Sequence, residues 1–576
     1  MSERFGKKNE MKTFLLTFII MSFMALRLSA QKINPQTEIE LPSDSTGSVR
    51  GDLKPEPKNP DLELPDVLIL GQDRSHRIIN DKKNLTPETP ALTAIRSEYS
   101  SDWTGLDEGK PSFAADSLNK SQTWGSLTGG TVYTFSGAAG HRRPIPEDDM
   151  LISGWVNRSE GQFANSKYAH LGLNGKVGYR LDERTMMMAR GVVQRSFYGM
   201  MQNGYRRQDS KRQMVGGKLS ADIFHDFNAI TDGSAGLEIG GLSLAGDTTG
   251  STADENSNFL MHFRLGLNSQ YRKSQLIFKA NYLRETNDSD ADTLTQAGRM
   301  GRLGFEWLYP FSSKMTAAAG INYASFAHDD SSAISRFSPF ARLNFIPSPP
   351  LGITLLLSSG LQYTPFSELW RQNQYLAHNI PFDPTDEKIG VKIKVETQPS
   401  KMVRLRASAQ KQWMNSLYFW QADTTTWLIT RDHLNDIEIS EIELGAVIEL
   451  TNSVQFYISY IDYSDQGISA GPQGEPSSYK IPYRPDFYLP IRADITLLHD
   501  LNLGIRAELW GARKKRLGGE EQLPSVFLVN IDAQKPLGQH VTALVSIHNL
   551  FNTSYSQWEN YPEMRFIFSA GVRVVF

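Results

Sequence analysis

The chain has 576 residues, and its 60 basic and 63 acidic side chains give a formal net charge of −3, so its charge gives no reason to expect a nucleic-acid partner. It contains no cysteine, which excludes disulfides, thiolate metal sites and a lipid anchor on an N-terminal cysteine. Mean hydropathy is −0.38, and no segment beyond the N-terminal region approaches the roughly 20 apolar residues of a transmembrane helix.

Residues 1–30 have the three parts of a secretory signal peptide. A basic stretch ending at Lys12 precedes an apolar run over 14–26, and small residues then precede a cleavage site before Gln31. Met11 is an alternative start that leaves these parts in place. The sequence therefore predicts export, with a mature chain that begins near Gln31.

Residues 31–121 differ in texture from everything that follows. Prolines are scattered among charged, serine and threonine residues, a composition typical of extended or irregular chain. We expect this segment to lie in the periplasm or in the lumen of a barrel formed by 122–576.

From residue 122 onward, apolar and polar side chains alternate in segments of about 10–15 residues. Val391, Ile393 and Val395 alternate with Lys392 and Lys394, for example. A lysine or arginine that faces lipid at the bilayer midplane costs about 2–4 kcal/mol, so the charged row should face inward. The pattern predicts an all-β fold, a transmembrane antiparallel β-barrel of the outer membrane.

The connections between these segments alternate in length. Short ones fall at 181–184, 272–273 and 451–453, and long polar ones include 285–296 and 415–436. In outer-membrane barrels the short turns face the periplasm and the long loops face outside. An even number of strands follows, and we expect about 22, with 20 as the alternative. So wide a barrel holds an open channel unless something fills it.

Aromatic side chains fall into two groups. Those near strand ends, Tyr309, Tyr460, Trp510 and Trp558, are typical of an interfacial girdle. The others fall in two long polar connections and are Trp370, Tyr375, Tyr418, Trp420 and Trp427. These loop aromatics either contact a ligand at the outer rim or pack the loops over the barrel mouth.

The last strand alternates apolar and polar residues and stops on an aromatic residue. Phe566, Phe568 and Phe576 lie on its apolar face, which we expect to meet outer-membrane lipid and to serve as a signal for the barrel assembly machinery.

Residues 525–576 carry a resemblance to a known family. Asn549, Leu550, Phe551, Asn552 and Tyr555 match the Asn-Leu-Phe-Asp/Asn-x-x-Tyr signature in the penultimate hairpin of TonB-dependent transporters. The likeness extends more loosely over the barrel from about residue 122. It implies an outer-membrane protein for uptake or surface binding of a ligand.

The front of the chain departs from that family. The residues Asp66, Val67, Leu68, Ile69, Leu70 and Gly71 resemble a TonB box, the segment that pairs with TonB as an added strand. Only about 50 residues separate it from a glycine-rich stretch, 124–133, that is similar to the end of the family's plug. This implies a reduced or missing plug. A segment tucked against the barrel is the alternative to the TonB box.

Two other functions remain open beside uptake. One is a scaffold barrel that holds a surface partner protein, and the other is a passive diffusion channel. The sequence shows no catalytic constellation and no metal-ligand spacing among its 11 histidines, so we expect neither an enzyme nor a cofactor.

Overall fold

The computed structural model describes residues 122–576 with short internal gaps. These gaps are 145–147, 164–165, 200–210, 247–253, 290–294, 329–332, 349, 374, 378–379, 382, 424–427, 452–453, 464–466, 471–475 and 498–499. No helix of the described residues is long and apolar enough to span a bilayer.

Twenty-two strands of the described chain close into one antiparallel barrel. The first eleven are β1 (Gln122–Gly130), β2 (Phe135–Pro144), β3 (Asp148–Ser159), β4 (Tyr168–Arg180), β5 (Thr185–Gly199), β6 (Lys211–Asn228), β7 (Thr231–Gly246), β8 (Asp254–Tyr271), β9 (Ser274–Ser289), β10 (Thr295–Ser312) and β11 (Met315–His328). The others are β12 (Ile334–Ser348), β13 (Leu351–Gln362), β14 (Thr385–Ser400), β15 (Val403–Ala422), β16 (Ile429–Thr451), β17 (Val454–Asp462), β20 (Phe487–Thr496), β21 (Asn502–Trp510), β24 (Val526–Pro536), β25 (Val541–His548) and β28 (Ile567–Val575).

Smaller elements lie in the connections between the barrel strands and are not part of the wall. They are η3 (Thr131–Tyr133), α3 (Phe366–Gln372), β18 (Gly467–Ala470), β19 (Pro476–Tyr479), β22 (Arg513–Lys514), β23 (Gln522–Leu523), β26 (Ser556–Trp558) and β27 (Tyr561–Pro562). The β18–β19 hairpin extends the sheet from the outer part of β16.

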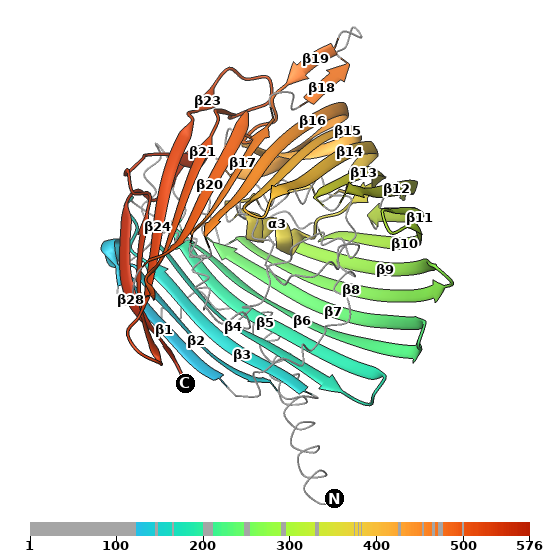
Figure 1. Ribbon diagram of the computed structural model, residues 1–576. Helices are drawn as coiled ribbons and strands as arrows, with labels where there is room; N and C mark the ends of the chain where they lie inside the picture. The colour runs from blue at the N-terminus through green and yellow to red at the C-terminus, as the bar shows by residue number, and fades with distance from the viewer. Residues whose placement is uncertain are drawn as a thin grey trace, which may run out of the picture.

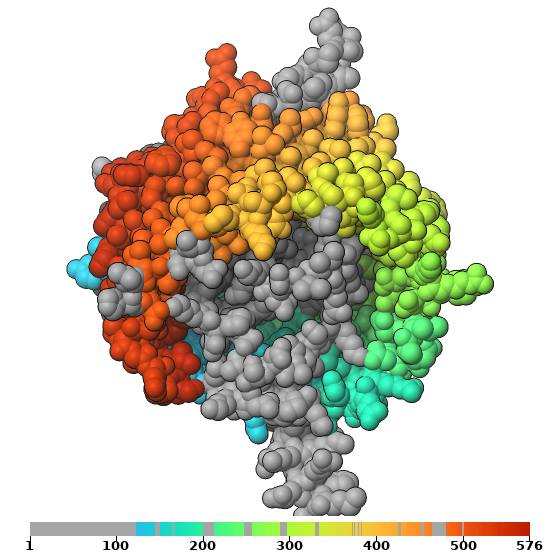
Figure 2. Space-filling view, in the orientation of Figure 1, coloured from blue at the N-terminus to red at the C-terminus, as the bar shows by residue number. Residues whose placement is uncertain are grey.

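The seam of the barrel joins the first strand to the last. β1 pairs with β2 on one side and with β28 on the other, from Trp124 opposite Val575 to Gly130 opposite Ser569. At the end of the seam the backbone N–H of Phe576 donates to the carbonyl of Thr123 over 2.8 Å. Every barrel strand therefore has two neighbours, which leaves no unpaired edge in the wall (Figure 1). In Figure 2 the blue start of the wall lies beside its red end. The prediction of 22 strands is confirmed.

The outer surface of the wall is an apolar band. On β10, Leu303, Phe305 and Trp307 are 43–50% exposed, and Val391 and Ile393 on β14 behave likewise. Within this band the charged residues of the same strands, such as Arg302 and Lys392, face the lumen, as predicted. So large an apolar band would be unfavourable in water but is favourable against lipid hydrocarbon. The closed barrel also satisfies the backbone hydrogen bonds of every strand within the membrane. The chain is therefore an outer-membrane β-barrel.

The ends of the barrel differ as the connection lengths predicted. Two residues, 272–273, join β8 to β9, and the start of β1 and the end of β28 lie at this same short-turn end. This end faces the periplasm and the opposite end faces outside.

Two of the predicted outer loops are largely strand. β15 runs on to Ala422 and β16 begins at Ile429, so most of the segment 415–436 continues the hairpin. Likewise β9 reaches Ser289 and β10 starts at Thr295. Above the membrane neither face of a strand meets lipid, so the alternation stops while the backbone hydrogen bonds continue. The sequence signal for a strand ends before the strand does.

The prediction of an interfacial girdle holds for two of its four aromatic residues. Tyr460 is 38% exposed on the outer face, and Tyr309 packs with Trp307 and Phe311. Trp510 and Trp558 are buried instead, in clusters under the outer loops, so they are not part of a girdle.

Candidate functional site

The connection between β13 and β14 folds into the barrel and covers its outer mouth. We call residues 363–384 the mouth loop; it contains the seven-residue helix α3, which lies inside the ring of strands in Figure 1. Phe366, Leu369 and Leu376 are 0% exposed. Such apolar side chains would be unfavourable in a solvated loop, and here they pack against the outer ends of the wall strands.

Glu285 of β9 fixes the start of the mouth loop. Its carboxylate is fully buried and accepts hydrogen bonds from the backbone N–H of Phe366, at 2.9 Å to each oxygen, and from the Tyr363 hydroxyl. The side-chain amide of Asn258 on β8 donates a further bond over 3.0 Å. A buried carboxylate needs this full set of donors. Glu285 therefore holds α3 by its first turn.

Arginines from two distant strands hold the middle and the end of the mouth loop. Arg212 of β6, 1% exposed, donates to the carbonyl of Leu376 over 2.8 Å and lies 5.1 Å from the ring of Trp370. Arg431 of β16 donates to the carbonyl of Pro381 over 3.2 Å. β6 and β16 are ten strands apart in a ring of 22, so they lie on nearly opposite walls. The mouth loop thus crosses the lumen.

Further contacts seal the loop against the wall. The Nε2 of His328 on β11 lies 2.7 Å from a carboxylate oxygen of Asp383. The backbone of Leu376 forms a parallel bridge with Ile429 at the start of β16. Tyr375 stacks on Tyr561 of β27 with ring centroids 3.8 Å apart.

The predicted loop aromatics that the structure describes are all buried in this cover. Trp370, Tyr375, Tyr418 and Trp420 are 1–9% exposed. Trp420 meets Trp558 edge to face, and the guanidinium of Arg431 lies over both Tyr418 and Trp420. In this conformation they pack the loops over the mouth. Trp427 lies outside the described residues.

Loops before β20, after β21 and after β25 complete the cover. Tyr483 packs against Trp558, and burial raises the pKa of its hydroxyl. Arg513 donates to the carbonyls of Ser556 and Gln557 over 2.8 and 3.2 Å, and burial lowers the pKa of its guanidinium to about 10. The outer end of the barrel is therefore closed by side chains from many strands.

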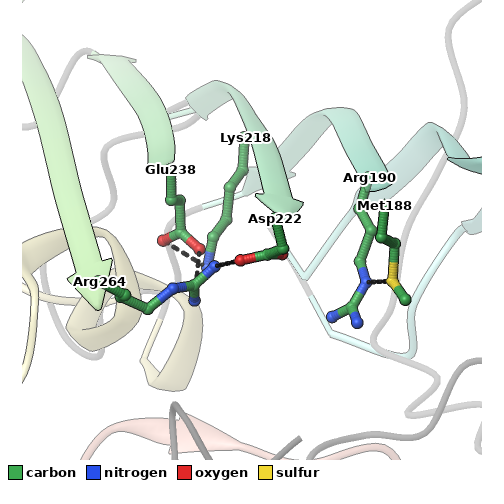
Figure 3. Close-up of polar contacts among 6 residues, drawn as sticks. All are labelled: Met188, Arg190, Lys218, Asp222, Glu238 and Arg264. Atoms are coloured by element: carbon green, nitrogen blue, oxygen red, sulfur yellow. Dashed lines mark hydrogen bonds and ion pairs between the residues drawn. The ribbon is translucent and has the colours of Figure 1, made fainter. Parts of the chain in front are cut away.

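Below the cover, the lumen wall carries charges that are neutralised in pairs. Lys218 of β6 lies 2.8 Å from Glu238 of β7, and Arg264 of β8 lies 2.8 Å from Asp222 of β6 and 3.8 Å from Glu238 (Figure 3). Outward neighbours such as Ile223 are exposed on the lipid face. Since opposite charges are interspersed, this arc of the wall favours neither anionic nor cationic ligands.

The family signature forms a tight turn at the outer end of β25. Asn549 has a φ of 51°, and its side chain accepts from the backbone N–H of Thr553 over 2.8 Å and donates to the carbonyl of Thr553 over 2.8 Å. The carbonyl oxygen of the Asn552 side chain accepts from the N–H of Phe566 over 3.2 Å. Tyr555 packs edge to face on Trp510. These residues shape the entry to the last strand.

The last strand presents its aromatic residues as the alternation predicted. Phe568 and Phe576 are 39% and 72% exposed on the outer surface, and the carbonyl of Phe566 accepts from the side chain of Gln162. The barrel assembly signal remains a prediction. The TonB-box-like segment, residues 66–71, and the proposed reduction of the plug lie outside the described residues.

The likeness of this chain to known proteins lies in its fold. No family model and no curated protein matches the chain. Among solved structures, it is similar to the siderophore receptor PiuA from Acinetobacter baumannii (TM-score 0.62, 12% identity, 79% of this chain and 82% of that one). It is also similar to the FrpB iron transporter from Neisseria meningitidis (TM-score 0.65, 11%, 80% and 82%) and to the copper transporter OprC (TM-score 0.64, 11%, 79% and 83%). The barrel has the fold of TonB-dependent receptors.

Proposed function

We propose that this outer-membrane barrel is a receptor that captures a ligand at its outer face and admits it when the mouth loop moves aside. The observation that carries this proposal is the attachment of the mouth loop to both β6 and β16, through Arg212 and Arg431. A passive channel would keep its lumen open, whereas this one is crossed by its own chain.

The aromatic side chains of the cover would contact the ligand once the mouth loop has moved. Displacing the mouth loop would expose Trp370, Tyr375, Tyr418 and Trp420, whose rigid rings offer contact area at low entropic cost. Trp427 belongs to the same predicted set. The solved structures with this fold include a siderophore receptor, an iron transporter and a copper transporter, so metal complexes are the ligand class to test first.

Opening would require energy, which the periplasmic side can supply. Residues 66–71 would pair with TonB as an added β-strand, a mode that draws its affinity from main-chain hydrogen bonds. The experiment is binding of the purified C-terminal domain of TonB to the mature protein and to a version that lacks 66–71. Loss of binding in the deletion supports energy-coupled uptake, and equal binding overturns this use of the segment.

Closure by the mouth loop has its own test in a planar bilayer. We compare the mature protein, a version that begins at Gln122, and the same truncated version with 363–384 replaced by a short Gly/Ser linker. We expect a large conductance only in the last of these. Free conduction by the truncated protein with its mouth loop intact would contradict the proposed closure and favour a channel.

A scaffold role is the second candidate, and one observation favours it. β15 and β16 have 20 and 23 residues, about twice the 9–11 that a membrane-crossing strand needs, so their hairpin continues beyond the membrane. Its tip packs over the mouth through Trp420 and Ile429, but Asp432 and His433 on the same hairpin are exposed and offer a surface for a partner protein. Normal assembly with neither TonB binding nor conductance after loop replacement would favour this role.

A further inference from the structure

Two arginines face each other on the outer surface of the barrel. Arg284 of β9 and Arg299 of β10 are direct cross-strand partners, and both are exposed. Their chain neighbours Glu285 and Met300 point inward and are buried. Like charges placed directly opposite each other destabilise a sheet. The pair therefore has an electrostatic cost that a bound anion would remove.

No carboxylate among the described residues forms an ion pair with either guanidinium. The flanking cross-strand partners are Met261 on β8 and Ala327 on β11. The next positions on the same face are Tyr282, Thr286, Ala297 and Gly301. Since none of these is acidic, the two positive charges are not neutralised within this part of the wall.

The pair lies at the outer boundary of the lipid-facing band. Tyr282, two residues before Arg284, and Leu303, four residues after Arg299, are 40% and 50% exposed. Arg284 follows the periplasmic turn residue Arg272 by twelve positions, just beyond the 9–11 residues that cross a bilayer. Lipid headgroups lie at this height.

The outer surface has free space just below the arginines, on their periplasmic side. Gly301 lies opposite Tyr282, between Arg299 and Leu303, and a Cβ placed on it would meet no atom within 4 Å. This space connects the charged pair with the apolar band. A headgroup could therefore approach the arginines while its acyl chains follow Leu303 and Phe305.

We propose that Arg284 and Arg299 bind the phosphate of an anionic lipid headgroup in the outer leaflet. Guanidinium groups present planar pairs of N–H donors that match phosphate oxygens, and two of them can grip one phosphate from both sides. Binding converts the repulsion between β9 and β10 into a bridge. The site fixes the height of the barrel in the membrane and lies apart from the lumen and the mouth loop.

The test uses the delipidated mature protein in detergent and native mass spectrometry. The probes are phosphorylated lipid A, the same lipid with its phosphate removed, and inorganic phosphate as a competitor. The variant is R284Q/R299Q. Each arginine near an anionic membrane surface contributes about 1 kcal/mol, or about fivefold in affinity, so we expect the double variant to bind phosphorylated lipid A roughly 30-fold more weakly. The dephosphorylated lipid should bind both proteins equally weakly.

A matched control comes from the same outer surface. Lys411 is exposed but lies 2.7 Å from Glu438, so its charge is already neutralised. K411Q should bind phosphorylated lipid A as the parent does. Heat-modifiable migration in gels shows that each variant is a folded barrel.

Three results would overturn the proposal. Equal binding of phosphorylated lipid A by R284Q/R299Q and the parent would show that the arginines make no contribution. Equal binding of both lipids by the parent would show that the apolar band alone holds them. Displacement of the lipid by an equimolar amount of inorganic phosphate would indicate a site for a free anion instead.

Discussion

The lipid-facing wall and the mouth loop belong to one barrel but are specified in different ways. In the wall, most strands pair with the strands next to them in sequence, and one alternation of side chains repeats throughout. The mouth loop is held by contacts that occur once each, such as Phe366 with Glu285, 81 residues away, and Leu376 with Arg212, 164 residues away. A repeated environment leaves a repeated sequence signal, whereas a set of contacts that each occur once does not.

The largest expected effect comes from placing a charged side chain on the lipid face of the wall. Ile458 faces lipid and its neighbour Ser459 faces the lumen, near Glu443. I458R should lower the free energy of unfolding by about 2–4 kcal/mol, because arginine then meets hydrocarbon. S459R, the matched control, should change it far less. Urea titration in lipid vesicles measures both, and equal losses would contradict the assignment of faces.

Removing one anchor of the mouth loop should have a somewhat smaller and local effect. R212Q leaves the carbonyl of Leu376 without its charged donor, which should destabilise the closed loop by about 1.5–3 kcal/mol. Hydrogen exchange at the amide of Ala377, which bonds to Ile429, reports this opening.

The control for that variant is R195Q. Arg195 lies on the adjacent strand β5 and bonds to the side chain of Gln213 rather than to the mouth loop. Its exchange at Ala377 should match the parent. Unchanged exchange in R212Q would show that Arg212 does not hold the loop.

These two regions also explain what the sequence could and could not predict. The alternation predicts that Val391 and Ile393 face lipid, and they do, because lipid and lumen alternate along a strand. Glu285 gave no signal, since it fell in an expected polar loop, 285–296, and its partners lie far away in sequence. The sequence indicates that Trp370 and Trp420 are unusual for polar loops, but spacing alone does not separate a ligand contact from a packing contact.

One outer turn differs from the mouth loop because its sequence carries a local signature. Asn549 adopts a φ of 51° and bonds to the backbone of Thr553. N549A should cost about 1–2 kcal/mol of unfolding free energy, from left-handed backbone strain and lost hydrogen bonds. N549G relieves the strain and should cost about 1 kcal/mol less. Equal losses in urea titrations would show that backbone strain is not the cause.

The smallest expected effect lies in a periplasmic turn of the wall. Hydrogen bonds from the N–H groups of Arg184 and Thr185 and from the Thr185 hydroxyl hold the pKa of Asp182 below its usual value. A lowered folded-state pKa contributes stability above the unfolded value of about 3.9, and this is lost as the pH falls through the folded value. D182N should flatten that part of the stability profile. An unchanged profile would contradict the role of this turn.

The most direct test of closure asks whether the mouth loop lies against the wall inside the lumen. Leu376 and Ile429 are bridge partners, and the chain has no cysteine, so L376C/I429C introduces a single pair of thiols. Closure predicts a disulfide in the assembled barrel, seen as a reduction-sensitive shift in gel migration. L376C/S325C, with Ser325 on the outer surface, should form none. Free thiols in L376C/I429C that react with an impermeant maleimide from outside would contradict closure of the mouth.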